Sequence, residues 1–251
     1  SGIGLAAARR LAREGMHLCL VHRDRRRECA ALADEVEAMR AHGVECLTFN
    51  LDALREESRE EVVGALRSAM GDHGRVRVLL HSISRGNLKP LAPDDDVAPH
   101  ATLSGADLAA TVEAMALSLY GWVRALLDPG LFAEDARVVG LTSEGSRRAW
   151  PAYAAVASAK GALEALCRSL ALELAPRGVR CNLLQPGVTD TRSLRMIPDS
   201  ERMIRQSEAR NPFRRLTRPE DVADVLYLLC RDEAAWINGA IVPVDGGERM
   251  A

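Results

Sequence analysis

Hydrophobic and polar positions follow two alternating patterns along the chain, and this alternation predicts an α/β fold. Short apolar runs rich in β-branched residues predict buried strands at 17–22, 44–50, 136–141, 178–185 and 240–244, and residues 75–84 predict a further strand with its exit loop. Between them, stretches with helical periodicity or many Ala, Leu and Glu residues predict helices at 1–15, 28–42, 58–71, 108–127 and 154–175, and from residue 218. Strands that alternate with helices are typical of a doubly wound, mostly parallel sheet with helices on both faces.

The alternation continues through the chain without a repeat, a low-complexity tract or a linker. A length of 251 residues suits one large α/β domain and is ample for a buried core. We therefore expect residues 1–251 to form a single domain.

Composition and charge exclude several classes of function. The chain has 33 basic and 35 acidic residues, so nothing suggests nucleic-acid binding. No apolar run is long enough to cross a membrane, and no signal-peptide pattern opens the chain. The six Cys residues are scattered without a Cys-x-x-Cys pair or a Cys/His cluster. We expect reduced thiols in a cytoplasmic protein, with no metal site.

The candidate catalytic residues lie between Leu141 and Lys160, in a segment that begins at the end of a predicted strand. Ser143 stands at the strand exit, where α/β folds bind ligands. At about 100° per residue, Tyr153 and Lys160 lie on nearly the same face of the following helix. A free Tyr, with a pKa near ~10, donates a proton poorly unless a cation such as a nearby ammonium stabilises its anion. The alternative is a surface Tyr and a solvated Lys on an Ala-rich helix.

This segment resembles the active-site stretch of the short-chain dehydrogenase/reductase superfamily. That superfamily usually has Tyr-x3-Lys, but Val156 stands four residues before Lys160. The spacing here is Tyr-x6-Lys, which is similar to the enoyl-acyl carrier protein reductases of bacterial fatty-acid synthesis. The surrounding LTSEGSRRAWPAY also resembles that branch. Many of its members carry a second Tyr at the position of Ser143, and the chain is closer to a smaller subgroup with Ser there.

Two further positions resemble the same branch. In the exit loop of the strand within 75–84, His81, Ser82, Ile83 and Ser84 stand where the superfamily usually has Asn-Asn-Ala-Gly, and the triplet His81-Ser82-Ile83 resembles the enoyl reductase branch. The resemblance implies that Ser82 and Ile83 line the ribose and nicotinamide side of a cofactor, and we assign His81 no catalytic role. In the helix predicted over 108–127, Ser118 takes the place of the usual network Asn.

The first residues, Ser1, Gly2, Ile3 and Gly4, are similar to the end of the superfamily's glycine-rich phosphate loop. Glycines at a helix N-terminus allow a pyrophosphate to approach the free N–H groups. In the superfamily pattern a strand and one more glycine precede this stretch. We therefore expect the first, central strand of the sheet to lie before residue 1.

Residues after the next two strands indicate the choice of cofactor. Arg23 follows the strand at 17–22, where an Arg suits the 2′-phosphate of NADPH and an acidic residue suits NADH. We favour NADPH, although Asp24 would serve NADH if the strand ended later. By resemblance Asn50 and Leu51 lie beside the adenine, with Asp52 as the alternative.

Near the end of the chain, Pro186, Gly187, Val188 and Thr189 resemble the loop whose backbone binds the nicotinamide carboxamide. Either Thr189 or Thr191 is expected to bind the cofactor. The polar residues 190–212 resemble a mobile lid over the substrate. Arg192, Arg195, Arg202 and Arg205 make this lid basic, which suits an acidic acyl carrier protein, and a solvated helix face is the equal alternative.

The resemblance implies an enoyl-thioester reductase acting on an acyl carrier protein or coenzyme A thioester. Tyr153 would stabilise the enolate oxygen, Lys160 would bind the nicotinamide ribose and bias Tyr153, and Ser143 would assist. The rivals are a 3-oxoacyl or other carbonyl reductase of the superfamily and a catalytically silent, cofactor-binding paralogue. Self-association into a homotetramer through the helices at 108–127 and 154–175 is also implied.

Overall fold

The computed structural model describes residues 2–93, 97–195, 197 and 200–251, without the side chains of residues 26, 27, 99 and 193. Its strands are β1 (Leu18–His22), β2 (Cys46–Asn50), β3 (Val76–His81), β4 (Phe132–Leu141), β5 (Val179–Pro186) and β6 (Ile241–Val244). The main helices are α1 (Gly2–Arg13), α2 (Arg26–Arg40), α3 (Glu56–Met70), α4 (Gly105–Val112), α5 (Ser118–Leu127), α6 (Ala154–Leu174), α8 (Ser200–Arg210) and α9 (Pro219–Cys230).

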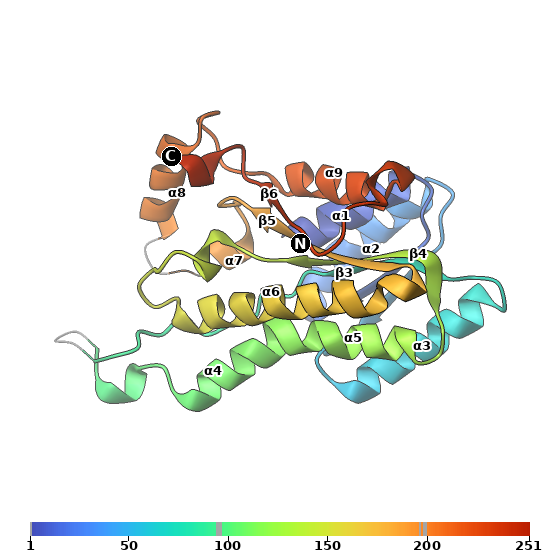
Figure 1. The fold of residues 1–251 in the computed structure, drawn as a ribbon, viewed down its shortest axis with the longest axis horizontal. Helices are drawn as coiled ribbons and strands as arrows, with labels where there is room; N and C mark the ends of the chain where they lie inside the picture. Colours follow the sequence, from blue (N-terminus) through green and yellow to red (C-terminus); the bar gives the residue numbers. More distant parts are fainter. Residues whose placement is uncertain (1, 94–96, 196, 198–199) are drawn as a thin grey trace.

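The strands are parallel and lie between two layers of helices. Strands β3, β4, β5 and β6 pair in that order, and β1 pairs with β2. Figure 1 shows α1 and α9 on one face of the sheet and α4, α5 and α6 on the other. The predicted α/β fold with a parallel, Rossmann-like sheet is confirmed.

Among the described residues, no strand joins the β1–β2 pair to the four-stranded sheet. The edges of the two sheets instead share helix α1 as a packing partner. Leu18 of β1 and both Val78 and Leu80 of β3 pack against one hydrophobic cluster that contains Ala6, Ala7 and Leu11 of α1. The strand expected before residue 1 stays a prediction.

Strand β4 begins at Phe132, four residues earlier than the sequence pattern predicts. The sequence Glu134–Arg137 has no apolar alternation, but its charges are satisfied within the fold. Asp135 forms ion pairs with Arg77, Arg137 and Arg180, which come from three neighbouring strands. Arg137 is 1% exposed because this carboxylate and the carbonyl of Leu229 accept its hydrogen bonds. Pairing of buried charges therefore extends the strand where hydrophobicity does not.

The helix predicted over 108–127 contains a π-helical turn at Glu113–Leu117, between α4 and α5. Ser118 Oγ donates a hydrogen bond to the carbonyl oxygen of Ala114, at 2.8 Å, directly beside this turn. Such bonds from Ser to the preceding turn bend helices, and single π turns are frequent at functional sites. The Ala- and Leu-rich pattern that predicts the helix contains no signal for the bend.

All six Cys residues are free, and four of them (Cys46, Cys167, Cys181 and Cys230) are buried. In the described part of the chain, no helix has both the length and the apolar character needed to span a bilayer. Within that same part, no group of three or more His, Cys, Asp or Glu side chains is arranged to bind a metal ion.

Candidate active site

A cavity of about 400 Å³ opens at the carboxyl ends of β3, β4 and β5. Its wall includes all three predicted catalytic residues, Ser143, Tyr153 and Lys160. The predicted cofactor residues in the same wall are Gly2, Ile3, Ser82, Ile83, Pro186, Gly187, Val188, Thr189 and Thr191. Segments far apart in the sequence therefore meet in one cavity, at the place where parallel α/β sheets bind ligands.

Tyr153 is the N-cap residue of α6, so its backbone stands half outside the helix. Its ring contacts that of Trp150 edge to face, with a centroid distance of 5.2 Å. On the other side it lies over Gly145, where an added Cβ would be 2.4 Å from Tyr153 Cε1. Burial raises the pKa of Tyr153 above its ordinary value, and the Ser143 hydroxyl acts weakly in the opposite direction. The phenol is therefore protonated and able to donate a hydrogen bond at neutral pH.

Ser143 follows the end of β4 by two residues and presents its hydroxyl to the cavity wall. Ser143 Oγ is buried without a well-aligned hydrogen bond to any described residue. A buried hydroxyl without a partner costs free energy, about 1–3 kcal/mol. A ligand oxygen beside Tyr153 would remove this cost.

Lys160 is 6% exposed, and its Nζ donates a hydrogen bond to the carbonyl oxygen of Leu141 at 2.7 Å. This bond ties the middle of α6 to the end of β4. Burial lowers the pKa of Lys160 from 10.5 to about 8. The side chain is thus mainly an ammonium at neutral pH and loses its proton in a mildly alkaline range.

His81, at the end of β3, is buried and close enough to Lys160 to be affected by its charge. Its Nε2 is 2.7 Å from Ser118 Oγ, and the Ser118 hydroxyl donates onward to Ala114. Burial and the charge of Lys160 lower the pKa of His81 to about 4. The ring is therefore neutral at physiological pH, and because the Ser118 proton is already used, Nε2 carries the hydrogen of the shared bond. His81 does not line the cavity, so it is a buried support for the end of β3.

The N-terminus of α1 forms one end of the cavity. Gly2 has a φ of 65°, a conformation that favours glycine, and an added Cβ would contact Thr191 Cγ2 at 3.5 Å. Gly4 does not line the cavity but packs on Ser82, where an added Cβ would be 3.3 Å from the hydroxyl oxygen. Ser1 lies outside the described residues. The remaining helix start leaves free N–H groups beside the cavity, as a pyrophosphate site requires.

Three predicted cofactor residues, Arg23, Asn50 and Leu51, lie outside the cavity wall at the ends of β1 and β2. Arg23 is the first residue after β1, and its side chain is 65% exposed while forming an ion pair with Asp52 at 3.0 Å. Asn50 exchanges two hydrogen bonds with the backbone of Asp24, each 3.0 Å long. The Asn50 amide therefore shapes the turn after β1, and its position does not by itself indicate adenine binding.

The loop after β5 is held in place from both sides. Thr189 Oγ1 donates to the carbonyl oxygen of Gly187 at 2.8 Å, and Thr189 pairs with Thr217 in an isolated bridge. Thr191 Oγ1 accepts a 3.3 Å hydrogen bond from the N–H of Leu194, at the start of α7 (Arg192–Arg195). Both Thr residues reach the cavity, so its geometry leaves both as candidates for the cofactor.

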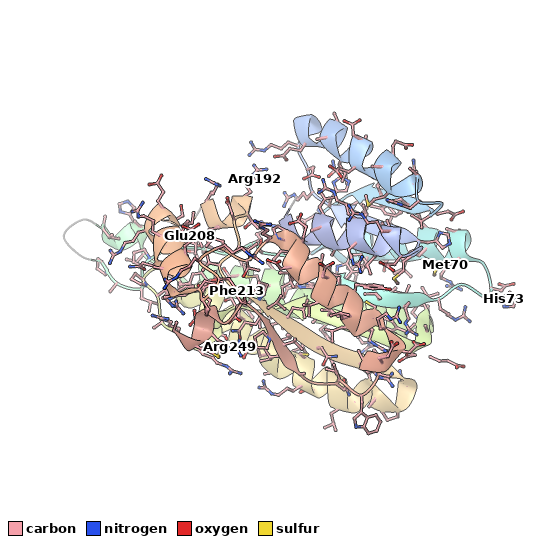
Figure 2. The ribbon with its side chains drawn as sticks, turned by 90° about the horizontal axis from the view of Figure 1, so that it is seen from above. Met70, His73, Arg192, Glu208, Phe213 and Arg249 are labelled. Carbon is pink, nitrogen blue, oxygen red and sulfur yellow. The ribbon has the colours of Figure 1, made fainter. Side chains whose placement is uncertain are left out.

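The predicted lid contains the short helix α7 and helix α8, while residues 196, 198 and 199 lie outside the described part of the chain. Figure 2 shows Arg192, Glu208, Phe213 and Arg249 in the left half of the view, and Met70 and His73 on the right. Arg residues of the lid pair with carboxylates: Arg192 with Glu28, Arg195 with Asp190, Arg205 with Glu201, and Arg210 with Glu144. These pairs reduce the net positive charge that the sequence suggests.

Sequence reasoning misses several residues of the cavity. Leu194, Ile197 and Met203 of the lid, together with Met115, Trp150 and Val156, give it an apolar side. Glu248 comes from the C-terminal turn and is 2% exposed. Only the two preceding glycines, Gly246 and Gly247, hint that the chain turns back there; both have positive φ.

The residues present fit a dinucleotide. The cavity extends from the N-terminus of α1 to Tyr153. Two buried polar atoms of its wall, Ser143 Oγ and Glu248 Oε1, have no well-aligned hydrogen bond to any residue that the structure describes. Gly2 and Gly4 keep the helix start free of side chains. A bound nicotinamide dinucleotide would be held at its phosphates by α1 and at its nicotinamide end by residues 186–191.

Replacing Gly145 by Ala should displace the Tyr153 ring, because the new Cβ would lie 2.4 Å from Cε1. A misplacement of this size costs up to about a hundredfold in rate, so we expect turnover to fall about ten- to hundredfold with cofactor affinity unchanged. Steady-state kinetics and cofactor titration measure the two effects. The matched control is Gly161→Ala on α6, where nothing lies within 4 Å. It should keep full turnover and raise the melting temperature by a few degrees.

Comparisons with known proteins agree with this geometry. Residues 1–248 match the family profile described as Enoyl-(Acyl carrier protein) reductase. The human protein named Dehydrogenase/reductase SDR family member 4 is 31% identical over 249 residues, covering 98% of this chain and 83% of that protein. The enoyl-[acyl-carrier-protein] reductase [NADH] FabI of Escherichia coli is 37% identical over 128 residues, 51% of this chain.

In the matches to FabI and to one further curated relative, the chain spans 47% and 45% of those proteins. Among solved structures, an enoyl-[acyl-carrier-protein] reductase (NADH) from Aquifex aeolicus superimposes with a TM-score of 0.81 at 23% identity. That match covers 99% of this chain and 92% of the other and supports the fold.

Proposed function

Because the chain belongs to the short-chain dehydrogenase/reductase superfamily, in the enoyl-(acyl carrier protein) reductase family, we propose that it reduces the 2,3 double bond of a trans-2-enoyl thioester. Membership makes the protein an NAD(P)-dependent oxidoreductase. The observation that carries the finer proposal is the Tyr-x6-Lys spacing of Tyr153 and Lys160, with both side chains in one cavity beside Ser143.

The cavity suits the charge changes of this reaction. NADPH, when bound, supplies a hydride for the β-carbon of the enoyl group. Negative charge then develops on the thioester oxygen, and the Tyr153 hydroxyl is the donor that stabilises it. Ser143 Oγ, buried and without a well-aligned hydrogen bond to any described residue, offers a second donor. The Lys160 ammonium lowers the cost of negative charge in this buried region and would hold the nicotinamide ribose.

The apolar side of the cavity supports an acyl substrate. Ile197 and Met203 of the lid face the same space as Trp150 and Val156. We infer that the lid, residues 190–212, covers the acyl chain and excludes water while the enolate forms. Since most lid Arg residues are paired, either an acyl carrier protein or coenzyme A can deliver the thioester.

We infer NADPH as the preferred cofactor. Arg23 directly follows β1, so the residue at the strand tip is basic. Asp24, the acidic alternative, comes one residue later, and its Oδ2 lies 2.9 Å from His22 Nδ1. The name of FabI points to NADH for that relative, so this inference rests on the residues of this chain.

Replacing Arg23 by Ala should weaken NADPH binding about tenfold or more, since a hydrogen bond to a charged group contributes about 1.5–3 kcal/mol. The dissociation constant for NADH should stay within about twofold, because NADH lacks the 2′-phosphate. Fluorescence titration of both cofactors measures this difference. Equal losses for NADPH and NADH would show that Arg23 acts on the fold and not on the phosphate.

We also infer a cytoplasmic homotetramer. Exposed apolar residues lie on the helices that the resemblance assigns to self-association: Leu117 and Tyr120 beside and on α5, at 48% and 43%, and Leu172 on α6, at 78%. Such side chains on neighbouring helices would be covered by a second copy. Light scattering would give four chains per particle, and a monomer at micromolar concentration would contradict the inference.

The proposed function is tested by following NADPH oxidation with a crotonyl thioester and with an acetoacetyl thioester. Turnover with the crotonyl thioester alone supports the enoyl reductase. Turnover with the acetoacetyl thioester alone would make the protein a carbonyl reductase, as the range of dehydrogenases among its relatives allows. Cofactor binding without turnover of either would favour a silent paralogue.

A further inference from the structure

Glu248 is a buried carboxylate in the cavity wall with no role in the proposed reaction. The two glycines with positive φ, Gly246 and Gly247, turn the chain so that Glu248 lies under the loop after β5. Glu248 Oε2 accepts a 3.1 Å hydrogen bond from the N–H of Val188. A Cβ added at Gly187 would be 2.7 Å from the same oxygen. The close approach therefore depends on glycine at 187.

The other carboxylate oxygen, Oε1, is buried and has no hydrogen-bond partner among the described residues. The carboxylate is stabilised from the lid, by the Ser207 hydroxyl and by the charge of Arg210, whose Nη2 also donates to the Glu248 carbonyl oxygen at 3.0 Å. Burial and the nearby Glu144 raise the pKa of Glu248, and the bonds from Ser207 and Val188 oppose that rise. Oε1 thus remains a buried oxygen without a donor among the described residues, which costs free energy.

We propose that Glu248 Oε1 is a ligand-binding group that accepts a hydrogen bond from an N–H or O–H donor of the molecule bound in the cavity. A plain enoyl chain and its thioester carry no such donor near the double bond. Two sources have the required chemistry: the carboxamide NH₂ of the nicotinamide and a hydroxyl on the substrate. Through its hydrogen bond with Val188, Glu248 lies against the loop that the resemblance assigns to the nicotinamide carboxamide. This position favours the carboxamide NH₂ as the donor. The inference rests on the proposed cofactor site.

The test uses Glu248→Gln in the full-length protein, with binding measured by calorimetry in the absence of turnover. Because the Val188 N–H still needs an acceptor, the amide oxygen takes the place of Oε2. The amide NH₂ then stands where Oε1 was, so a donor faces the donor of the ligand. We expect the dissociation constant of NADP⁺ to rise about ten- to hundredfold. The matched control is Glu208→Gln, exposed on α8 and labelled in Figure 2, which should bind NADP⁺ within about twofold of wild type.

The two sources are separated with the 3-acetylpyridine analogue of NADP⁺, in which an acetyl group replaces the carboxamide and no NH₂ is present. If the carboxamide is the donor, wild type and Glu248→Gln bind this analogue equally well. If the substrate is the donor, the variant binds NADP⁺ normally but loses about tenfold in affinity for a 4-hydroxy-2-enoyl thioester and none for the crotonyl thioester. Either pattern supports the proposal.

Unchanged affinity for NADP⁺ and for both thioesters in a folded Glu248→Gln protein would overturn the proposal. Thermal unfolding establishes that the variant is folded. If it is not, Glu248→Asp keeps the charge but withdraws it by one methylene, and the same losses are expected. Because no step requires turnover, the result is independent of whether crotonyl thioesters are reduced.

Discussion

Replacing Tyr153 by Phe is expected to lower the turnover of an enoyl thioester about 100- to 1000-fold. The hydroxyl is the donor at the oxygen where negative charge develops, and removing one such donor has effects of this size. The Phe ring keeps the edge-to-face contact with Trp150 and the packing over Gly145. The fold and the affinity for NADPH should therefore be retained, so that the loss falls on turnover.

Stopped-flow or steady-state measurement of NADPH oxidation gives the turnover of this variant, and cofactor titration provides the control. Ser143→Ala should cost less, because Ser143 assists and Tyr153 remains. A Tyr153→Phe protein with more than a third of wild-type turnover would show that another group stabilises the enolate.

Replacing Lys160 by Met should abolish most of the activity, with a loss of at least about a hundredfold, while leaving the fold intact. Met is close to Lys in volume and needs no desolvation of a charge, so it suits a site that is 6% exposed. The carbonyl oxygen of Leu141 loses the hydrogen bond from Lys160, but Leu141 remains paired with Leu184 of β5. We expect the melting temperature to stay within a few degrees of wild type while turnover and NADPH affinity both fall. A parallel fall in melting temperature and activity would make Lys160 a structural residue.

The same residue predicts a pH dependence. Its pKa is lowered from 10.5 to about 8, so the ammonium is lost in the folded protein as the pH rises through about 8. Turnover should decline over that range, and the decline should be absent from the residual activity of Lys160→Met. Between pH 8 and 10.5 the unfolded chain binds more protons than the folded one, so the contribution of Lys160 to stability rises with pH there. Activity and stability should thus change in opposite directions in mildly alkaline buffer.

The parts of the fold that hydrophobic periodicity controls could be predicted from the sequence. Five strands either lie inside the ranges that apolar runs predict or differ from them by one or two residues: β1, β2, β3, β5 and β6. The start of β4 could not be predicted, because the buried Arg137 and the partly exposed Asp135 belong to an ion-paired network contributed by three strands. The π turn before Ser118 depends on one side chain to backbone bond. Periodicity carries no information about either.

The candidate site likewise contains residues that the sequence predicts and residues that it does not. Ser143, Tyr153 and Lys160 are close in sequence and follow one strand, so their spacing predicts a shared cavity. Glu248 lies 60 residues beyond Val188, the loop residue that it binds, and no local pattern marks it. Gly145 is another example, because its importance comes from the Tyr153 ring above it, eight residues later in the sequence.

The central claim is tested most directly by locating the transferred hydrogen. The protein is incubated with a crotonyl thioester and NADPH that carries deuterium at the transferable position of C4, and the product is analysed by NMR. The account predicts a butyryl thioester with one deuterium at the β-carbon and a solvent proton at the α-carbon. No deuterium in the crotonyl product, together with 3-hydroxybutyryl thioester deuterated at C3 from an acetoacetyl thioester, would contradict it.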